Sequence, residues 1–106
     1  MELNVLRDNA ARATSLLKSL ANEDRLLLLC QLVDGEKSVS ELERLTGIRQ
    51  PTLSQQLGVL RNEKLVSTRR DGKWIYYSVA SADALAILGT LHGIFCGAEG
   101  QLQPAA

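Results

Sequence analysis

The sequence predicts a mainly α-helical domain with five helices and one β-hairpin in its second half. Three observations predict this fold class. Apolar residues recur at the three- and four-residue steps of amphipathic helices on both sides of residues 65–79. A short helix that closes with a glycine is followed within a few residues by another helix, which opens near Pro51. Two strand-like runs flank Asp71-Gly72, a pair typical of two-residue hairpin turns.

Chain length and composition limit the class of protein. A chain of 106 residues that is 45% hydrophobic forms one domain, over residues 1–106, with a modest core. No apolar run is long enough to span a membrane, and acids stand where a signal peptide needs bases, so we expect a cytoplasmic protein. No catalytic constellation is visible, and we expect neither an enzyme nor a bound cofactor.

The first helix, over residues 3–20, carries a regular apolar seam. Its members follow alternating steps of three and four residues and are Leu3, Leu6, Ala10, Ala13, Leu17 and Leu20. This is the heptad spacing of a seam between two helices. The seam can pack within the chain, but a domain of this size rarely needs so regular a seam, which favours a subunit interface.

The second and third helices have clear caps. Asn22 suits the N-cap of the second helix, which ends at Asp34-Gly35. Apolar residues cover nearly all sides of this helix, so we expect it to be central and buried. Ser38-Val-Ser-Glu41 is a capping box that opens a short helix, and Thr46-Gly47 closes it. The expected core residues of the short helix are Val39, Leu42 and Leu45.

The stretch over residues 50–61 has the features of a DNA-reading helix. Pro51 suits its first position, and three leucines at helical spacing form one buried stripe. The remaining faces carry amides and hydroxyls but no acid, and such groups can read base edges without being repelled by phosphate. An ordinary amphipathic helix with a polar face is the alternative. The candidate base-reading residues are Gln50, Thr52, Ser54, Gln55 and Gln56.

A basic hairpin is expected next, with strands over residues 65–70 and 73–79. With Asp71-Gly72 as the turn, Arg69 would face Trp74 as a cation–π pair, and Arg70 would face Lys73 at the tip. A basic hairpin that directly follows a helix-turn-helix is a wing. Residues 38–79 would then form the DNA-reading part, and a solvated hairpin tip is the alternative.

The charge distribution supports a nucleic-acid partner although the net charge is zero. Residues 49–73 contain six bases and two acids, so this segment carries +4 and the rest of the chain −4. A basic segment on a neutral protein indicates a localised electrostatic site. The residues expected to hold phosphates or enter the minor groove are Arg49, Arg69, Arg70 and Lys73.

The last helix is expected from Ser81 to about Gly97. Gly89, Gly93 and Gly97 recur every four residues, and interior glycines cost about 0.8–1 kcal/mol each relative to alanine. That cost is tolerated where a second helix must approach closely. We therefore expect this helix and the first one to form the interface of a homodimer.

Two segments carry a family resemblance over about residues 3–98. LTGIRQPTLSQQLGVLR (residues 45–61) and TRRDGKWIYY (residues 68–77) resemble the ArsR/SmtB family of winged-helix bacterial repressors. The likeness is greatest to the BigR/SqrR subgroup of sulfide- and persulfide-responsive repressors, which also have one cysteine in the second helix and one late in the last. The resemblance implies a winged helix-turn-helix homodimer that binds pseudo-palindromic, double-stranded operator DNA.

The two cysteines, Cys30 and Cys96, are the candidate effector site. By residue type alone, Cys30 in its leucine run is a small buried hydrophobe, whereas Cys96 has His92 one turn before it on the same face. The resemblance implies instead that the two thiols form one redox switch. A reactive sulfur species would crosslink them, through a disulfide or a polysulfide, and so release the DNA.

The sequence departs from the metal-sensing members that it otherwise resembles. Ser38 and Ser40 stand where thiolate sensors place cysteines, and hydroxyls bind soft metals poorly. At the other metal site of the family, Leu85 stands where a histidine would follow Asp83, and Cys96 and Glu99 hold the late places. We therefore assign no metal ligands. Two alternatives stay open: a metal-responsive repressor that uses Cys30, His92, Cys96 and acids nearby, and a winged-helix module that binds a protein.

Overall fold

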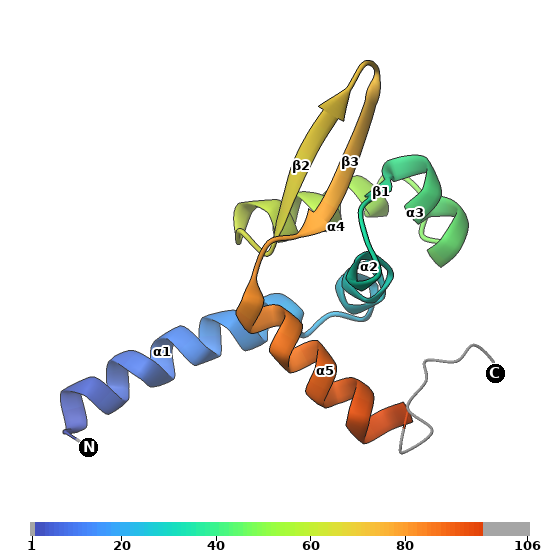
Figure 1. Ribbon diagram of the computed structural model, residues 1–106. Coiled ribbons are helices and arrows are strands. Elements are labelled where there is room, and N and C mark those ends of the chain that lie inside the picture. The colour runs from blue at the N-terminus through green and yellow to red at the C-terminus, as the bar shows by residue number, and fades with distance from the viewer. Residues whose placement is uncertain (1, 97–106) are drawn as a thin grey trace.

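The protein consists of five helices and three strands in a computed structural model that describes residues 2–96 (Figure 1). The helices are α1 (Leu3–Leu20), α2 (Glu23–Val33), α3 (Val39–Thr46), α4 (Thr52–Asn62) and α5 (Ala82–Cys96). The strands are β1 (Lys37–Ser38), β2 (Val66–Asp71) and β3 (Trp74–Val79). The predicted mainly helical fold with a β-hairpin wing is confirmed. Gly97, the expected end of the last helix, lies outside the described residues.

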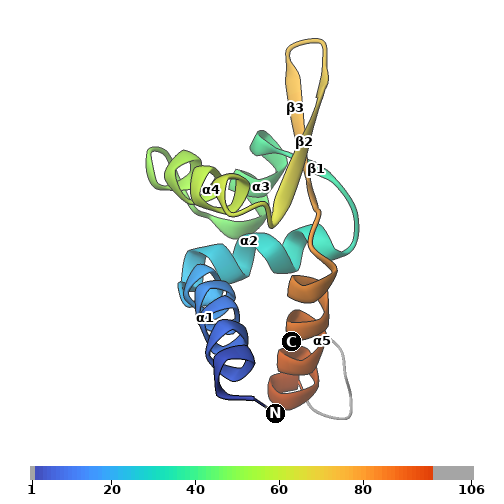
Figure 2. The ribbon, with the colours of Figure 1, turned by 90° about the vertical axis from the view of Figure 1, so that its left-hand side faces the viewer.

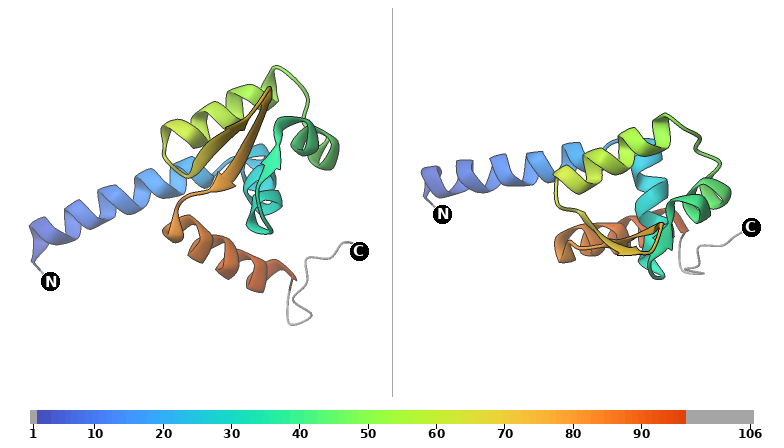
Figure 3. Two further views of the ribbon diagram at one scale, coloured as in Figure 1. Left: turned by 45° about the horizontal axis from the view of Figure 1, so that its top comes forward. Right: turned by 90° about the horizontal axis from the view of Figure 1, so that it is seen from above.

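The wing and the two outer helices lie at opposite ends of the molecule. The β2–β3 hairpin projects from one end, α1 and α5 lie at the other, and α2 runs between them (Figures 1 and 2). Both α3 and α4 pack against α2, and the view from above shows α4 crossing over it (Figure 3). Helices α3 and α4 therefore share α2 as their support.

The predicted helix caps are confirmed. Asn22 Oδ1 accepts a hydrogen bond from the Arg25 N–H (3.0 Å), and Ser81 Oγ accepts one from the Ala84 N–H (3.0 Å). At α3, Ser38 Oγ accepts from the Glu41 N–H (3.2 Å) while Glu41 Oε1 accepts from the Ser38 N–H (2.8 Å), which completes the capping box. These short-range contacts set where the helices begin.

The core consists mainly of leucines from α2, α3 and α4. The fully buried ones are Leu28, Leu29, Leu42, Leu53, Leu57 and Leu60. Two expectations are wrong. Leu45 is exposed rather than buried, and α2 is buried on one side only, because Leu27, Cys30 and Val33 are exposed. A core of this size encloses the side of α2 that meets α3, α4 and β3, and leaves the opposite side open.

The sheet contains a strand that the sequence did not indicate. Two-residue β1 pairs with β3, so the strand order is β1-β3-β2, with all pairs antiparallel. The hairpin turn also lies one residue later than expected. Asp71 pairs with Trp74, which leaves Gly72 (φ 64°) and Lys73 as the turn, with glycine at the first turn position where a positive φ is needed.

This shift changes every facing pair on the wing. Arg69 lies opposite Tyr76, and Arg70 lies opposite Ile75. The predicted pairs of Arg69 with Trp74 and of Arg70 with Lys73 are therefore wrong.

Candidate DNA-reading surface and thiol site

Helix α4 is anchored by the predicted leucine stripe and presents its opposite side to solvent. Leu53, Leu57 and Leu60 are fully buried, whereas Ser54 and Gln55 are exposed and Thr52 is half-buried. The helix begins at Thr52, with Pro51 as the preceding N-cap residue, so the expected place of Pro51 is wrong by one position. A one-residue difference lies within the usual spread of helix ends.

Gln50 is exposed beside the start of α4, where its side chain forms a hydrogen bond to the first turn of the helix. Gln50 Oε1 accepts a hydrogen bond from the Ser54 N–H (3.1 Å), one of the N–H groups that the helix itself leaves without a partner. The amide oxygen is thereby used within the protein, and the amide N–H groups are what the side chain offers to a base edge.

Gln56 makes a tertiary contact that the sequence did not reveal. Its Oε1 accepts a hydrogen bond from Arg25 Nη1 of α2 (2.7 Å), and the residue is half-buried. The same guanidinium donates from Nε to the Ser19 carbonyl (2.6 Å) and from Nη2 to the Lys18 carbonyl (3.1 Å). Arg25 therefore joins the end of α1 to α4, and Gln56 lies on the flank of α4 rather than on its outward face.

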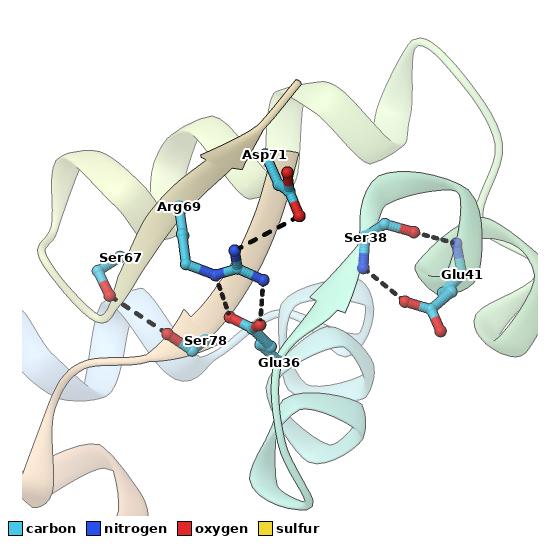
Figure 4. Close-up of polar contacts among 7 residues, drawn as sticks. All are labelled: Glu36, Ser38, Glu41, Ser67, Arg69, Asp71 and Ser78. Atoms are coloured by element: carbon cyan, nitrogen blue, oxygen red, sulfur yellow. Dashed lines mark hydrogen bonds and ion pairs between the residues drawn. The ribbon is translucent and has the colours of Figure 1, made fainter. Parts of the chain in front are cut away.

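Arg69 is engaged across the sheet instead of projecting freely (Figure 4). Its Nε donates to Glu36 Oε2 (3.2 Å), its Nη2 donates to Glu36 Oε1, and its Nη1 lies 3.9 Å from Asp71 Oδ2. The guanidinium carbon also lies 4.7 Å from the centroid of the Tyr76 ring. The hydrogen bond from Arg69 holds the pKa of Glu36 below its usual value, and the same contact raises the pKa of Arg69.

The other predicted phosphate-binding bases are exposed. Arg49 precedes α4, Arg70 lies on β2, and Lys73 occupies the hairpin turn. The Lys73 ammonium lies 5.6 Å from the ring centroid of Trp74, a loose contact that leaves the charge at the surface. The wing tip and the N-terminal approach to α4 thus present positive charge.

The two thiols lie together between α2 and α5. Cys30 and Cys96 are both free and line one cavity of about 250 Å³ with Leu26, Leu88, Leu91, His92 and Phe95. Cys30 is exposed, contrary to the expectation that it is buried, because α5 covers α2 incompletely. Partial burial against apolar neighbours raises the pKa of the Cys30 thiol, and the nearby Cys96 raises it further.

The predicted interface helices present apolar surface to solvent. On α1, Leu3, Leu6 and Leu17 of the seam are exposed, and only Leu20 at its end is buried. On α5, Phe95 is 81% exposed and Ile94 is 64% exposed. A methyl group added at Gly89 or Gly93 would meet no other group within 4 Å. Within the described chain, these glycines are not required for close packing.

Comparison with known proteins gives the family. A family model described as "Bacterial regulatory protein, arsR family" matches residues 22–68. The chain is 49% identical over 96 residues to the biofilm growth-associated repressor of Xylella fastidiosa strain 9a5c, covering 91% of this chain and 84% of the relative. The protein belongs to the arsR family of bacterial regulatory proteins.

Solved structures agree with this assignment. The arsR-family fold superposes on the transcriptional repressor BigR from Xylella fastidiosa with a TM-score of 0.84 and 47% identity, covering 92% of this chain and 99% of that one. It also resembles the homodimeric winged helix-turn-helix DNA-binding domain of a possible ArsR-family regulator from Mycobacterium bovis, with a TM-score of 0.69 and 32% identity. That match covers 88% of this chain and 83% of that one. In this arsR-family regulator, α3 and α4 form the helix-turn-helix and β2–β3 is the wing.

Two residues of the site, Arg25 and Glu36, were not predicted from the sequence. Arg25 stands in the first turn of α2, where the helix dipole disfavours a base, and this is a signal that it has a tertiary partner. Glu36 carries no comparable signal, because its partner Arg69 lies 33 residues further along the chain.

The described part of this arsR-family chain brings no metal site together. Among residues 2–96, no three His, Cys, Asp or Glu side chains are grouped closely enough to hold an ion. Asp83 lines a different cavity from Cys96, beside Arg12 and Glu63, and Glu99 lies outside the described residues. No helix in the described range is long and apolar enough to cross a membrane.

Proposed function

We propose that this arsR-family regulator is a homodimeric repressor that reactive sulfur species switch off through Cys30 and Cys96. The observation that carries the proposal is the position of the two thiols, which line one apolar cavity between α2 and α5. In the reduced state the dimer binds a pseudo-palindromic operator. Crosslinking the thiols releases it.

Different residues of the proposed DNA-binding surface contact bases and phosphates. Ser54 and Gln55 face outward from α4 and read base edges, together with Thr52 and the amide N–H groups of Gln50. Arg49, Arg70 and Lys73 contact phosphates or enter the minor groove. In a two-fold symmetric dimer the two α4 helices enter major grooves one DNA turn apart, about 34–36 Å.

A homodimer accounts for the apolar faces of α1 and α5. Exposed leucines on α1 and the exposed Ile94 and Phe95 on α5 would be covered by a second copy of the chain. The open space at Gly89 and Gly93 lets another helix approach closely. The structural relative from Mycobacterium bovis, which is homodimeric, supports this assembly.

The switch requires two chemical steps. First, one thiolate attacks the outer sulfur of a persulfide R–S–SH, so that a cysteine persulfide forms and the thiol R–SH leaves. The second thiolate then attacks Sγ of the first cysteine, the inner sulfur of the persulfide, so that a disulfide forms, the sulfur–sulfur bond of the persulfide breaks and the outer sulfur leaves as H₂S. A direct bridge needs Cα atoms about 4.4–6.8 Å apart, and each inserted sulfur atom relaxes this limit.

The crosslink would act on DNA binding through α2. A covalent bridge from Cys30 to Cys96 ties α2 to the helix that covers the proposed dimer interface. Because α3 and α4 both pack on α2, a shift of α2 relative to α5 changes the spacing of the two reading helices. The two α4 helices then no longer fit both half-sites of the operator at once.

Operator binding by four proteins tests the proposal. Wild-type protein should lose binding after persulfide treatment and regain it with reductant, whereas Cys30→Ser, Cys96→Ser and the double variant should bind in both conditions. Intact mass should show a crosslink in wild type alone and give the number of bridging sulfur atoms. If both single variants still released DNA, the thiols would be structural and the effector site would lie elsewhere.

A limiting dose of persulfide tests the order of the two steps. We expect Cys96 to react first and Cys30 to resolve it, because His92 lies one turn before Cys96 on α5, while partial burial raises the pKa of the Cys30 thiol. Mass spectrometry of the Cys30→Ser variant should find persulfide on Cys96. Faster labelling of Cys30 in the Cys96→Ser variant would reverse the order.

A further inference from the structure

The Arg69 side chain extends from β2 across β3 to the residue before β1, along one face of the sheet. It starts on β2 and reaches Glu36, just before β1 (Figure 4). On the way its guanidinium lies over the ring of Tyr76 on β3. Because the strand order is β1-β3-β2, this one side chain links the two edges of the sheet. Asp71 adds a weaker ion pair from the tip side, at 3.9 Å.

The acceptor of this contact, Glu36, stands next to the start of the helix-turn-helix. Glu36 stands two residues before Ser38, which is buried and forms the capping box of α3 with Glu41. Ser38 also pairs with Tyr76 in the sheet. Glu36 therefore connects the wing to the point where the first helix of the helix-turn-helix begins.

The geometry distinguishes this contact from an ordinary surface ion pair. Isolated exposed pairs contribute little, because water screens them and two long side chains must be ordered. Here two guanidinium nitrogens donate to the two oxygens of one carboxylate while the guanidinium lies over a ring. Paired hydrogen bonds of this kind add directional restraint that a point charge does not supply.

We propose that Glu36 and Arg69 are positioning residues that hold the wing at a fixed angle to the helix-turn-helix. The proposal rests on operator binding, in which α4 and the wing must contact DNA at the same time. A wing that is already oriented loses less conformational freedom on binding, and this raises affinity. Arg69 thus supports the DNA contacts of Arg70 and Lys73 rather than making one.

Substitution of Glu36 tests the proposal, because positioning and simple electrostatics predict opposite changes in DNA affinity. Removing an acid near phosphates should strengthen DNA binding if electrostatics alone matters. If Glu36 positions the wing, Glu36→Ala should weaken operator binding by about tenfold, which is the effect expected from losing one hydrogen bond to a charged group. Asp71→Asn is the control, because it removes an acid from the wing itself and only the weaker ion pair with Arg69, and it should leave affinity unchanged or raise it.

Two substitutions at position 69 separate positioning from phosphate contact. Arg69→Lys keeps the charge but loses the paired hydrogen bonds, so it should weaken operator binding about as much as Glu36→Ala. The charge exchange Glu36→Arg with Arg69→Glu should bind better than Arg69→Glu alone. Wild-type affinity in Arg69→Lys, or no recovery in the exchanged protein, would overturn the proposal.

The single tryptophan supplies a readout that needs no DNA. Trp74 lies on the wing, so its time-resolved fluorescence anisotropy reports wing motion in the free protein. We expect Glu36→Ala to enlarge the fast component of the anisotropy decay and Asp71→Asn to leave that component unchanged. Both variants should have the melting temperature of wild type. An unchanged decay in Glu36→Ala would overturn the proposal. Failure of wild-type protein to bind any operator would instead refute the proposed function.

Discussion

At the scale of single residues, the polar side chains suited to DNA divide into two groups. Gln56 and Arg69 are held by partners within the protein, and these partners are Arg25 and Glu36. Ser54, Gln55, Arg70 and Lys73 remain outward. Residue type predicts the chemistry of both groups equally well, because an amide or a guanidinium suits a base edge, a phosphate or a neighbouring side chain.

Arg70→Ala should weaken binding to all DNA sequences alike. Loss of one phosphate contact should flatten the slope of log affinity against log salt concentration by about 0.9. Filter binding or anisotropy titrations between low and moderate salt measure that slope. Arg7→Ala, which removes an exposed base from α1 at the far end of the molecule, should leave it unchanged. An unaltered slope in Arg70→Ala would remove the wing tip from the phosphate-binding surface.

The neighbouring amides Gln55 and Gln56 should behave differently. Gln55→Ala should relax specificity at one base pair, by about 1–3 kcal/mol, with normal stability. Gln56→Ala should lower the free energy of unfolding by roughly 1 kcal/mol, because Arg25 loses an acceptor. Urea unfolding and binding-site selection measure the two effects. A changed base preference in a fully stable Gln56→Ala protein would make Gln56 a base reader.

At the scale of secondary-structure elements, local caps determine where helices begin, whereas long-range contacts determine which strands form and pair. Asn22, Ser38 and Ser81 all cap helices as predicted, because each cap depends on residues only three positions apart. The sheet shows the opposite case. Strand β1 has only two residues and exists because β3 supplies its hydrogen bonds.

The capping box should make stability depend on acid pH. The hydrogen bond from the Ser38 N–H holds the pKa of Glu41 below its usual value. Glu41 therefore stabilises the fold above the unfolded pKa of about 4.3, and this contribution is lost as pH falls through the lower folded value. Thermal unfolding should show Glu41→Gln less stable than wild type at pH 7, with the difference shrinking in acid. A constant difference across the acid range would contradict the assignment.

At the scale of the whole molecule, the apolar surface of α1 and α5 points to a second copy of the chain. The thiol cavity lies between α2 and α5, beside the side of α2 that the core leaves open. Cores of small domains enclose few elements completely, and assembly can cover the rest.

Gly93→Leu distinguishes a dimer interface from an isolated helix. In a monomer the change should be neutral or stabilising, because a side chain at Gly93 meets nothing within 4 Å and leucine favours helices. In a dimer it should overpack the interface and cost about 1–3 kcal/mol or more. Sedimentation equilibrium of the reduced proteins measures the dissociation constant. A well-folded wild-type monomer at micromolar concentration would refute the assembly.

The amino-acid sequence alone predicted the order of helices and hairpin, the caps, the leucine stripe of α4 and the family. These features depend on periodicity and on neighbours a few positions apart, which a single sequence displays directly. The folded chain was needed to show that Cys30 is exposed, that the hairpin turn lies at Gly72-Lys73, and that Arg69 is held by Glu36. Each of these depends on residues distant in the chain, because burial, register and the choice among equivalent polar partners are set only when the elements pack together.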